Sequence, residues 1–282
     1  MTEPNARNAF DRWGWLLVLP FAAAGWAIVS STADRGTSAW SLWAAIVVAL
    51  TASAGGACVY GVKRWRELAQ TVKAETRFAD VVGPIVFFVG VSAFIGAAYE
   101  VVFLPVVKRV EWRGGLILVV VFLGIVPILA TMAAIGKHAA RPVTQPWAEE
   151  FDRLIRCRRM TQRLLVVLGG LVALLVAAQA SAYARYERPS TLLTVGFGVY
   201  ASVMVAVAYA PAAERLRRKG LSLIDVWLPL PPEPGELLDA AEKRARAEAL
   251  LGTDKSVFGD LQTNLVVVTP LIAAAVSALL PA

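Results

Sequence analysis

Long apolar stretches alternate with short polar segments along most of this chain. As a helix, a stretch needs roughly 20 residues with few charges to cover the hydrocarbon core of a bilayer, which is about 30 Å thick. Seven stretches meet this requirement, at residues 13–31, 40–62, 81–107, 114–136, 164–183, 191–213 and 261–281. The pattern therefore predicts an all-α, polytopic helical membrane protein with seven transmembrane helices.

The first stretch also resembles a secretory signal peptide, because basic residues precede it and alanines 22–24 look like a small-residue cleavage region. Against cleavage, Glu3 and Asp11 dilute the basic segment. Trp13 and Trp26 are typical of aromatic anchors near the two membrane interfaces. We favour an uncleaved first helix, and its removal would leave the orientation of the other six unchanged.

Lys and Arg residues are concentrated on alternate sides of the predicted helices. Of the 28 basic residues, 22 lie before the first helix or in segments 63–77, 137–163 and 215–255, which share one side. Cytoplasmic loops carry such an excess of basic residues. The sequence therefore predicts a plasma (inner) membrane protein with its N-terminus in the cytoplasm and its C-terminus outside.

The composition agrees with this class and argues against several others. With 57% hydrophobic and 17% charged residues, the chain is too apolar for a single soluble domain of 282 residues. The net charge of +7 is spread over several loops among acidic residues, which favours membrane lipids with anionic head groups over nucleic acid as partners. Because Cys58, Cys157 and His138 are the only cysteines and histidine, we expect no metal site, no cofactor and no catalytic activity.

Two of the predicted helices carry small residues at every fourth position, in the same register relative to a tyrosine. Close backbone approach through such residues supplies much of the packing between membrane helices. We therefore expect helix contacts at Ser53, Ala57 and Gly61 in the helix at 40–62, and at Gly198, Ser202 and Ala206 in the helix at 191–213.

The shared register also predicts an internal repeat. Beyond the basic segment that follows each of these helices, the chain reads Val-Val-Gly-Pro from residue 81 and Val-Val-Thr-Pro from residue 267. We interpret 1–107 and 164–282 as two parallel three-helix units joined by a linker helix at 114–136. This layout resembles the SWEET sugar carriers, although no SWEET motif is present and the predicted orientation is opposite. Chance similarity between two Ala-, Val- and Leu-rich segments is the alternative.

Few polar side chains lie inside the predicted helices. Glu100 is the one ionisable side chain clearly within a helix, and Ser92, Gly96 and Glu100 recur at intervals of four on one helical face. A charged carboxylate at the bilayer centre costs about 2.5–3.5 kcal/mol, so it is expected to face the bundle or water. With Gln179 and Asn264, these residues are candidates for a solute pathway. The alternative places Glu100 at the outer interface with a packing role.

The basic side also carries long polar segments. The loop 214–260 holds the residues that we expect to bind lipid head groups or a protein partner, namely Arg215, Arg217, Arg218, Lys219 and Trp227. The pattern at residues 236–251 predicts an amphipathic helix that ends at Gly252. A further cytoplasmic helix is expected within 137–163, from Trp147 into the next membrane helix.

Two functions are compatible with these features. The first is a transporter or channel-like pathway for a small solute, with Glu100 as the coupling group. The alternative is a non-catalytic scaffold, sensor or effector that acts through its cytoplasmic segments on a protein partner or anionic lipid. The sequence leaves homo-oligomerisation open.

Overall fold

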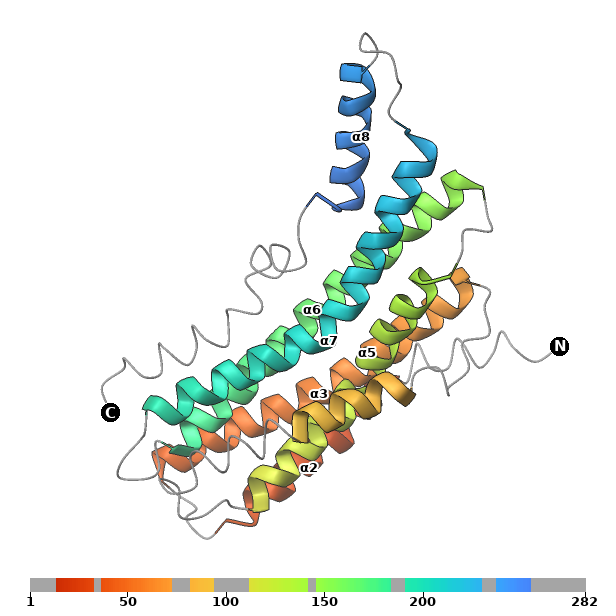
Figure 1. The fold of residues 1–282 in the computed structure, drawn as a ribbon. Helices are drawn as coiled ribbons and strands as arrows, with labels where there is room; N and C mark the ends of the chain where they lie inside the picture. The colour runs from red at the N-terminus through yellow and green to blue at the C-terminus, as the bar shows by residue number, and fades with distance from the viewer. Residues whose placement is uncertain are drawn as a thin grey trace, which may run out of the picture.

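A computed structural model describes residues 14–32, 37–72, 82–93, 112–141, 146–183, 191–229 and 237–254 (Figure 1). All regular secondary structure within these ranges is helical, which confirms the all-α class. A short apolar helix, Val82–Ala93, lies between α3 and α5 in the sequence. The other elements are the 3-10 helix η1 (Gly14–Leu17) and helices α2 (Val18–Ser30), α3 (Ser38–Val72), α5 (Trp112–Ala139), α6 (Trp147–Tyr183), α7 (Thr191–Trp227) and α8 (Leu237–Leu251).

Four helices are long and apolar enough to cross a membrane, which supports the assignment as a membrane protein. They are Ser38–Gln70, Arg113–Ala139, Trp147–Ala182 and Thr194–Trp227. The shorter apolar helices Gly14–Ser30 and Val82–Ala93 lie on the first and third predicted stretches. The seventh stretch, 261–281, lies outside the described residues, so the number of seven spans and the parallel repeat stay predictions.

Helix α3 packs against α2, α5 and α6, and glycines allow its close approach to α5. A Cβ atom built on Gly61 would lie 2.8 Å from the backbone nitrogen of Ile128. A Cβ atom on Gly124 of α5 would lie 2.5 Å from the carbonyl oxygen of Ala54. Because neither position has room for a side chain, the two backbones meet directly, as small residues allow in membrane helix pairs.

The six residues expected at helix contacts differ in burial. Ala57, Gly61 and Gly198 are buried, Ser202 and Ala206 are partly buried, and Ser53 is exposed. A spacing of four residues exceeds the 3.6 residues of one helical turn, so a row at this spacing drifts by about 40° at each step. This drift carries Ser53 off the face that holds Ala57 and Gly61.

Helices α6 and α7 continue without a break beyond their apolar stretches. The stretch in α6 starts at Leu164, whereas the helix starts at Trp147, which adds about 25 Å of helix at 1.5 Å per residue. Helix α7 likewise runs on to Trp227. We call residues 147–163 and 214–227, together with α8, the projection.

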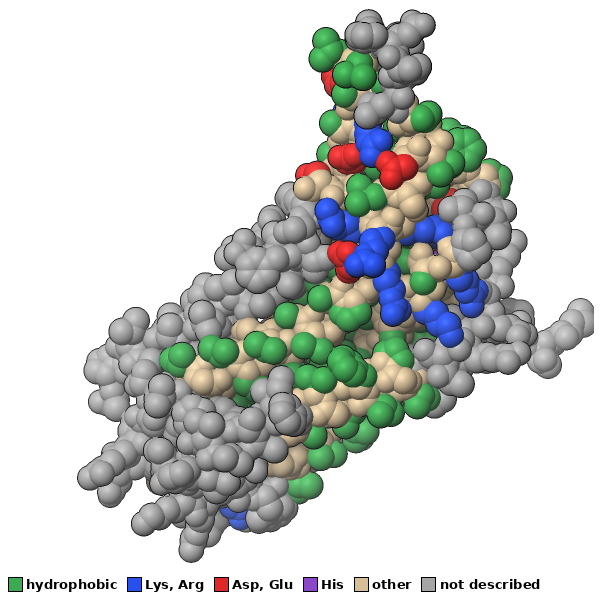
Figure 2. All heavy atoms as spheres, viewed as in Figure 1, with side chains coloured by type: hydrophobic (Ala, Val, Ile, Leu, Met, Phe, Trp, Pro, Cys, Tyr) green, Lys and Arg blue, Asp and Glu red, His purple; other side chains and the backbone are tan. Residues whose placement is uncertain are grey.

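The projection differs from the rest of the bundle in its surface. Figure 1 shows α8 beside the end of α7, at one extremity of the molecule. Figure 2 shows Lys, Arg, Asp and Glu side chains gathered over this end, whereas hydrophobic side chains dominate the described surface of the helices below. The apolar core nevertheless extends into the projection, because Ile224 and Leu251 are buried in the same cluster as Leu50 and Ile128. The projection is therefore packed onto the bundle.

Candidate functional site

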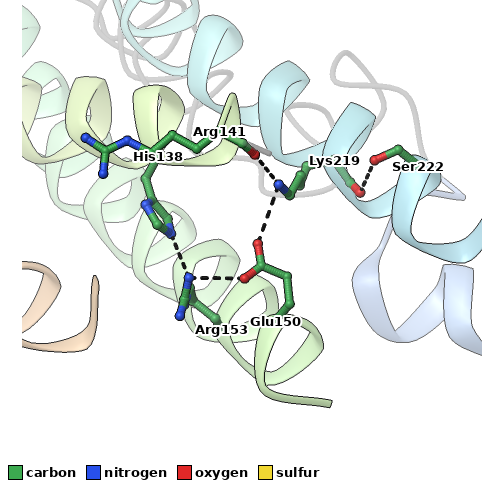
Figure 3. A network of polar contacts seen from close by, with 6 residues as sticks. All are labelled: His138, Arg141, Glu150, Arg153, Lys219 and Ser222. Atoms are coloured by element: carbon green, nitrogen blue, oxygen red, sulfur yellow. Dashed lines mark hydrogen bonds and ion pairs between the residues drawn. The ribbon is translucent and has the colours of Figure 1, made fainter. Parts of the chain in front are cut away.

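A buried ionic network joins α5, α6 and α7 where the projection meets the end of α5 (Figure 3). The Lys219 ammonium on α7 lies 3.6 Å from Oε1 of Glu150 on α6. The Arg153 guanidinium lies 3.1 Å from Oε2 of the same carboxylate. The side chains of Glu150 and Lys219 are only 6% and 7% exposed. One buried carboxylate therefore compensates two cations.

His138 and Arg141, at the end of α5, complete the network. Nε2 of His138 lies 3.3 Å from the guanidinium of Arg153. Arginine only donates hydrogen bonds, so this nitrogen must accept, and the ring is neutral with its hydrogen on Nδ1. Nδ1 is buried and has no hydrogen-bond partner among the residues that the structure describes. The Lys219 ammonium donates to the carbonyl oxygen of Arg141, so the network holds the end of α5 against both α6 and α7.

Helix α8 ends in a motif that fixes it to the other two helices of the projection. Gly252 adopts a positive φ of 59°. Its amide donates to Ala249 at 3.1 Å, and the Thr253 amide donates to Glu248 at 2.9 Å. These two bonds form a Schellman motif, in which the positive φ favours glycine. The sequence places the end of the helix at the same residue.

Three arginines bind α8 to its neighbours. Arg158 of α6 donates to the carbonyl oxygen of Leu251, and Arg217 of α7 donates to that of Thr253 at 3.3 Å. Arg244 of α8 pairs with Asp225 of α7 and also contacts Glu248. Hydrogen bonds to Asp225 and then to Glu248 raise the pKa of Arg244 above its usual value. Helix α8 is thus held at its last turn and near its middle.

The far end of the projection exposes large apolar side chains. The rings of Trp147 and Trp227, from α6 and α7, contact each other with centroids 5.9 Å apart. Both remain about half exposed, and Val226 and Leu238 are 71% and 79% exposed. We call Trp147, Val226, Trp227 and Leu238 the exposed apolar set.

The four basic residues expected at lipid head groups have different environments. Lys219 is buried in the network described above. Arg218 pairs with Glu214 at 2.7 Å, and Arg217 lies 3.9 Å from the same carboxylate. Arg215 is exposed and makes no ion pair within the described part of the chain. Arg215 is therefore the member of this group whose charge is free for a ligand.

Only part of the expected solute pathway falls within the described ranges. Ser92 binds α7, since its hydroxyl lies 3.7 Å from the sulfur of Met204 and its carbonyl oxygen accepts from the Tyr200 hydroxyl at 3.3 Å. Gln179 is partly buried on α6. Glu100, Gly96 and Asn264 lie outside the described residues. The pathway therefore stays a prediction.

Sequence reasoning missed the network, although Glu150 lies in the first turn of the helix expected from Trp147. Carboxylates in a first turn are explained by the helix dipole alone, so nothing pointed to a partner on α7. Among the residues that the structure describes, no group of three or more His, Cys, Asp or Glu side chains could hold a metal ion. No protein-family model, curated protein or solved structure matches the chain.

Proposed function

We propose that this protein is a non-catalytic membrane scaffold whose projection binds a protein partner in the cytoplasm. The observation that carries the proposal is the construction of the projection. Two membrane helices continue beyond their apolar stretches, a buried ionic network sets their relative position, and a third helix is fixed to them. The result is a rigid surface at a defined distance from the bilayer.

The buried network supports a role in orientation. Burying charges costs several kcal/mol per ion, and a buried pair is often no more stabilising than well-packed apolar side chains. A pair such as Glu150 and Lys219 does, however, require a matching partner on the facing helix. It therefore selects one arrangement of α6 and α7. A scaffold needs such a fixed arrangement, whereas well-packed apolar side chains would be enough for stability alone.

The position of the exposed apolar set favours a protein over lipid as the ligand. Trp227, which contacts Trp147, lies about 21 Å along α7 from the end of its apolar stretch at residue 213, and an average tilt of about 20° removes little of this distance. The attraction of anionic head groups falls off within a Debye length, about 8 Å at physiological ionic strength. Tryptophan side chains are among the groups enriched at the centres of protein interfaces.

The cytoplasmic location rests on the charge distribution of the sequence. The projection contains most of the basic residues of segments 137–163 and 215–255, and such segments face the cytoplasm in membrane proteins. The partner is therefore expected to be a cytoplasmic protein, or a cytoplasmic segment of another membrane protein, with an apolar surface of its own.

Photo-cross-linking in intact cells tests the proposal. A photoreactive residue is placed at Leu238 or Val226, and at the exposed, charged position Arg246 of α8 as the matched control. We expect one discrete protein adduct from the first two positions and not from Arg246. Replacing Trp227 with Ala should remove this adduct. Lipid adducts alone, or the same mixture of adducts from all three positions, would contradict a protein partner.

A further inference from the structure

A cavity of about 320 Å³ lies between the short helix Val82–Ala93, α5 and α7. Its walls include Phe87, Phe88, Met132 and Val207. Of the described residues that line it, Arg215 alone has a polar or charged side chain. A polar solute in this cavity would lose most of its hydrogen bonds, which is energetically unfavourable. The cavity therefore suits an apolar ligand with one anionic group.

The cavity lies in the half of the bundle next to the projection. It is lined by the first residues of the short helix and by the ends of the apolar stretches of α5 and α7, down to Gly136 and Ala212. Arg215 follows the stretch 191–213 directly. In the predicted orientation, the apolar walls lie within the cytoplasmic leaflet and the guanidinium lies at the level of its head groups.

The stem of Arg215 passes beside Gly136 of α5 at this rim. A Cβ atom built on Gly136 would lie 3.2 Å from Cα of Ala212 and 3.6 Å from Cδ of Arg215. The arginine stem therefore passes close to the α5 backbone. As an exposed guanidinium without an ion pair in the described residues, Arg215 can bind a phosphate through two hydrogen bonds.

We propose that this cavity binds one acyl chain of an anionic phospholipid whose phosphate group pairs with Arg215. The volume is near the lower end of small-molecule sites, about 300 to 1,000 Å³, which accommodates part of one acyl chain and excludes a whole lipid. A net negative head group is preferred because the zwitterionic head group of phosphatidylcholine would bring a second cation close to Arg215. This site is separate from the exposed apolar set, so it does not depend on the proposed protein partner.

The site is tested by native mass spectrometry of the purified full chain with phosphatidylglycerol or phosphatidylcholine. A Cβ atom on Gly83, which lines the cavity, meets nothing within 4 Å among the described residues, so Gly83→Leu is chosen to add a side chain at the cavity wall. The matched control is Gly90→Leu, because Gly90 is on the same helix, is equally open and does not line the cavity. For the head group, Arg215→Gln is compared with Arg218→Gln, whose side chain is paired with Glu214.

We expect phosphatidylglycerol to bind about tenfold more weakly to Gly83→Leu, the loss for roughly two displaced methylenes. Binding to Arg215→Gln should be about fivefold weaker. Both controls should bind like the wild type, and phosphatidylcholine should bind more weakly than phosphatidylglycerol to the wild type. Equal binding by Gly83→Leu and Gly90→Leu would overturn the acyl-chain site, and equal binding by the two Arg variants would overturn the role of Arg215. Competition by glycerol phosphate as strong as that by phosphatidylglycerol would also overturn the chain site.

A second measurement needs no variant and remains informative if Gly83→Leu fails to fold. Phosphatidylglycerol with a photoreactive group in its acyl chain is cross-linked to the wild type, and the labelled peptides are mapped. We expect adducts on Phe87 and on α5 between Leu129 and Gly136. Uniform labelling that also includes the exposed lipid-facing residues Leu118 and Leu123 would show that the chain occupies no particular site.

Discussion

Lys219 of α7 lies 3.6 Å from Glu150 of α6, and both side chains are buried although they lie beyond the apolar stretches of their helices. Glu150 also binds Arg153 at 3.1 Å. The carboxylate is therefore shared between two cations, whereas Lys219 has a further acceptor in the carbonyl oxygen of Arg141. Loss of the carboxylate should therefore destabilise the protein more than loss of the ammonium, and the free energy of unfolding measures this difference.

Replacing Glu150 with Gln should destabilise the protein by about 3 to 5 kcal/mol, because two buried cations lose the carboxylate that they share. Replacing Lys219 with Met should cost less, about 1 to 3 kcal/mol, since Glu150 keeps Arg153 as a partner. The free energy of unfolding in detergent, from denaturant titration, measures both.

Arg156→Gln is the control for these variants, because Arg156 and Asp152 form an ion pair that is mostly exposed. We expect a change within about 0.5 kcal/mol. If Lys219→Met were as destabilising as Glu150→Gln, or if neither differed from Arg156→Gln, the network would not fix α6 and α7 as described.

Replacing Gly252 with Ala should release α8 from the projection. The positive φ of 59° costs a residue with a Cβ atom roughly 1 to 2 kcal/mol, and the new Cβ atom would overlap the guanidinium of Arg158. Hydrogen exchange should become faster in the amides of α8 and stay unchanged in α3. Gly170→Ala, on an open position of α6, should leave hydrogen exchange unchanged in both α8 and α3. Unaltered protection of α8 in Gly252→Ala would show that the motif does not hold the helix.

Two glycines of α3 should respond to alanine in opposite directions. A Cβ atom on Gly61 would lie 2.8 Å from the Ile128 backbone, whereas one on Gly56 meets nothing of the described chain within 4 Å. Gly61→Ala is expected to destabilise by about 1 to 3 kcal/mol through overpacking. Gly56→Ala should stabilise by about 0.5 to 1 kcal/mol, because alanine loses less backbone entropy in a helix. Thermal unfolding in detergent distinguishes them, and equal stability of the two variants would exclude direct contact between the α3 and α5 backbones.

Local signals predicted the helical elements well. Apolar length placed the four long membrane helices, and Gly252 marked the end of α8, because each depends on residues near one another in the sequence. Trp147, expected to start a helix, is the first residue of α6. The seven spans, the parallel repeat and the pathway around Glu100 remain predictions, because they depend on residues outside the described ranges.

The sequence could not predict which way each basic side chain faces. A count of Lys and Arg indicates the side of the membrane, but it carries no information on the rotation of a helix about its axis. Arg215 and Lys219, one turn apart, were assigned the same role. In the structure Arg215 lines a cavity next to α5, whereas Lys219 is buried against α6. This difference arises from packing between helices that are distant in the sequence.

We expect the apolar helices to cross the bilayer with the projection in the cytoplasm. Labelling a single cysteine from each side of the membrane tests this expectation most directly. Cys58 and Cys157 are first replaced by Ala, and Arg156→Cys is introduced on the projection, with Gly114→Cys at the opposite end of α5 as the control. A membrane-impermeant maleimide should label the cysteine at 156 in inverted vesicles and not in intact cells, and the one at 114 in intact cells. Labelling of the cysteine at 156 from outside intact cells would contradict both the orientation and the proposed cytoplasmic scaffold.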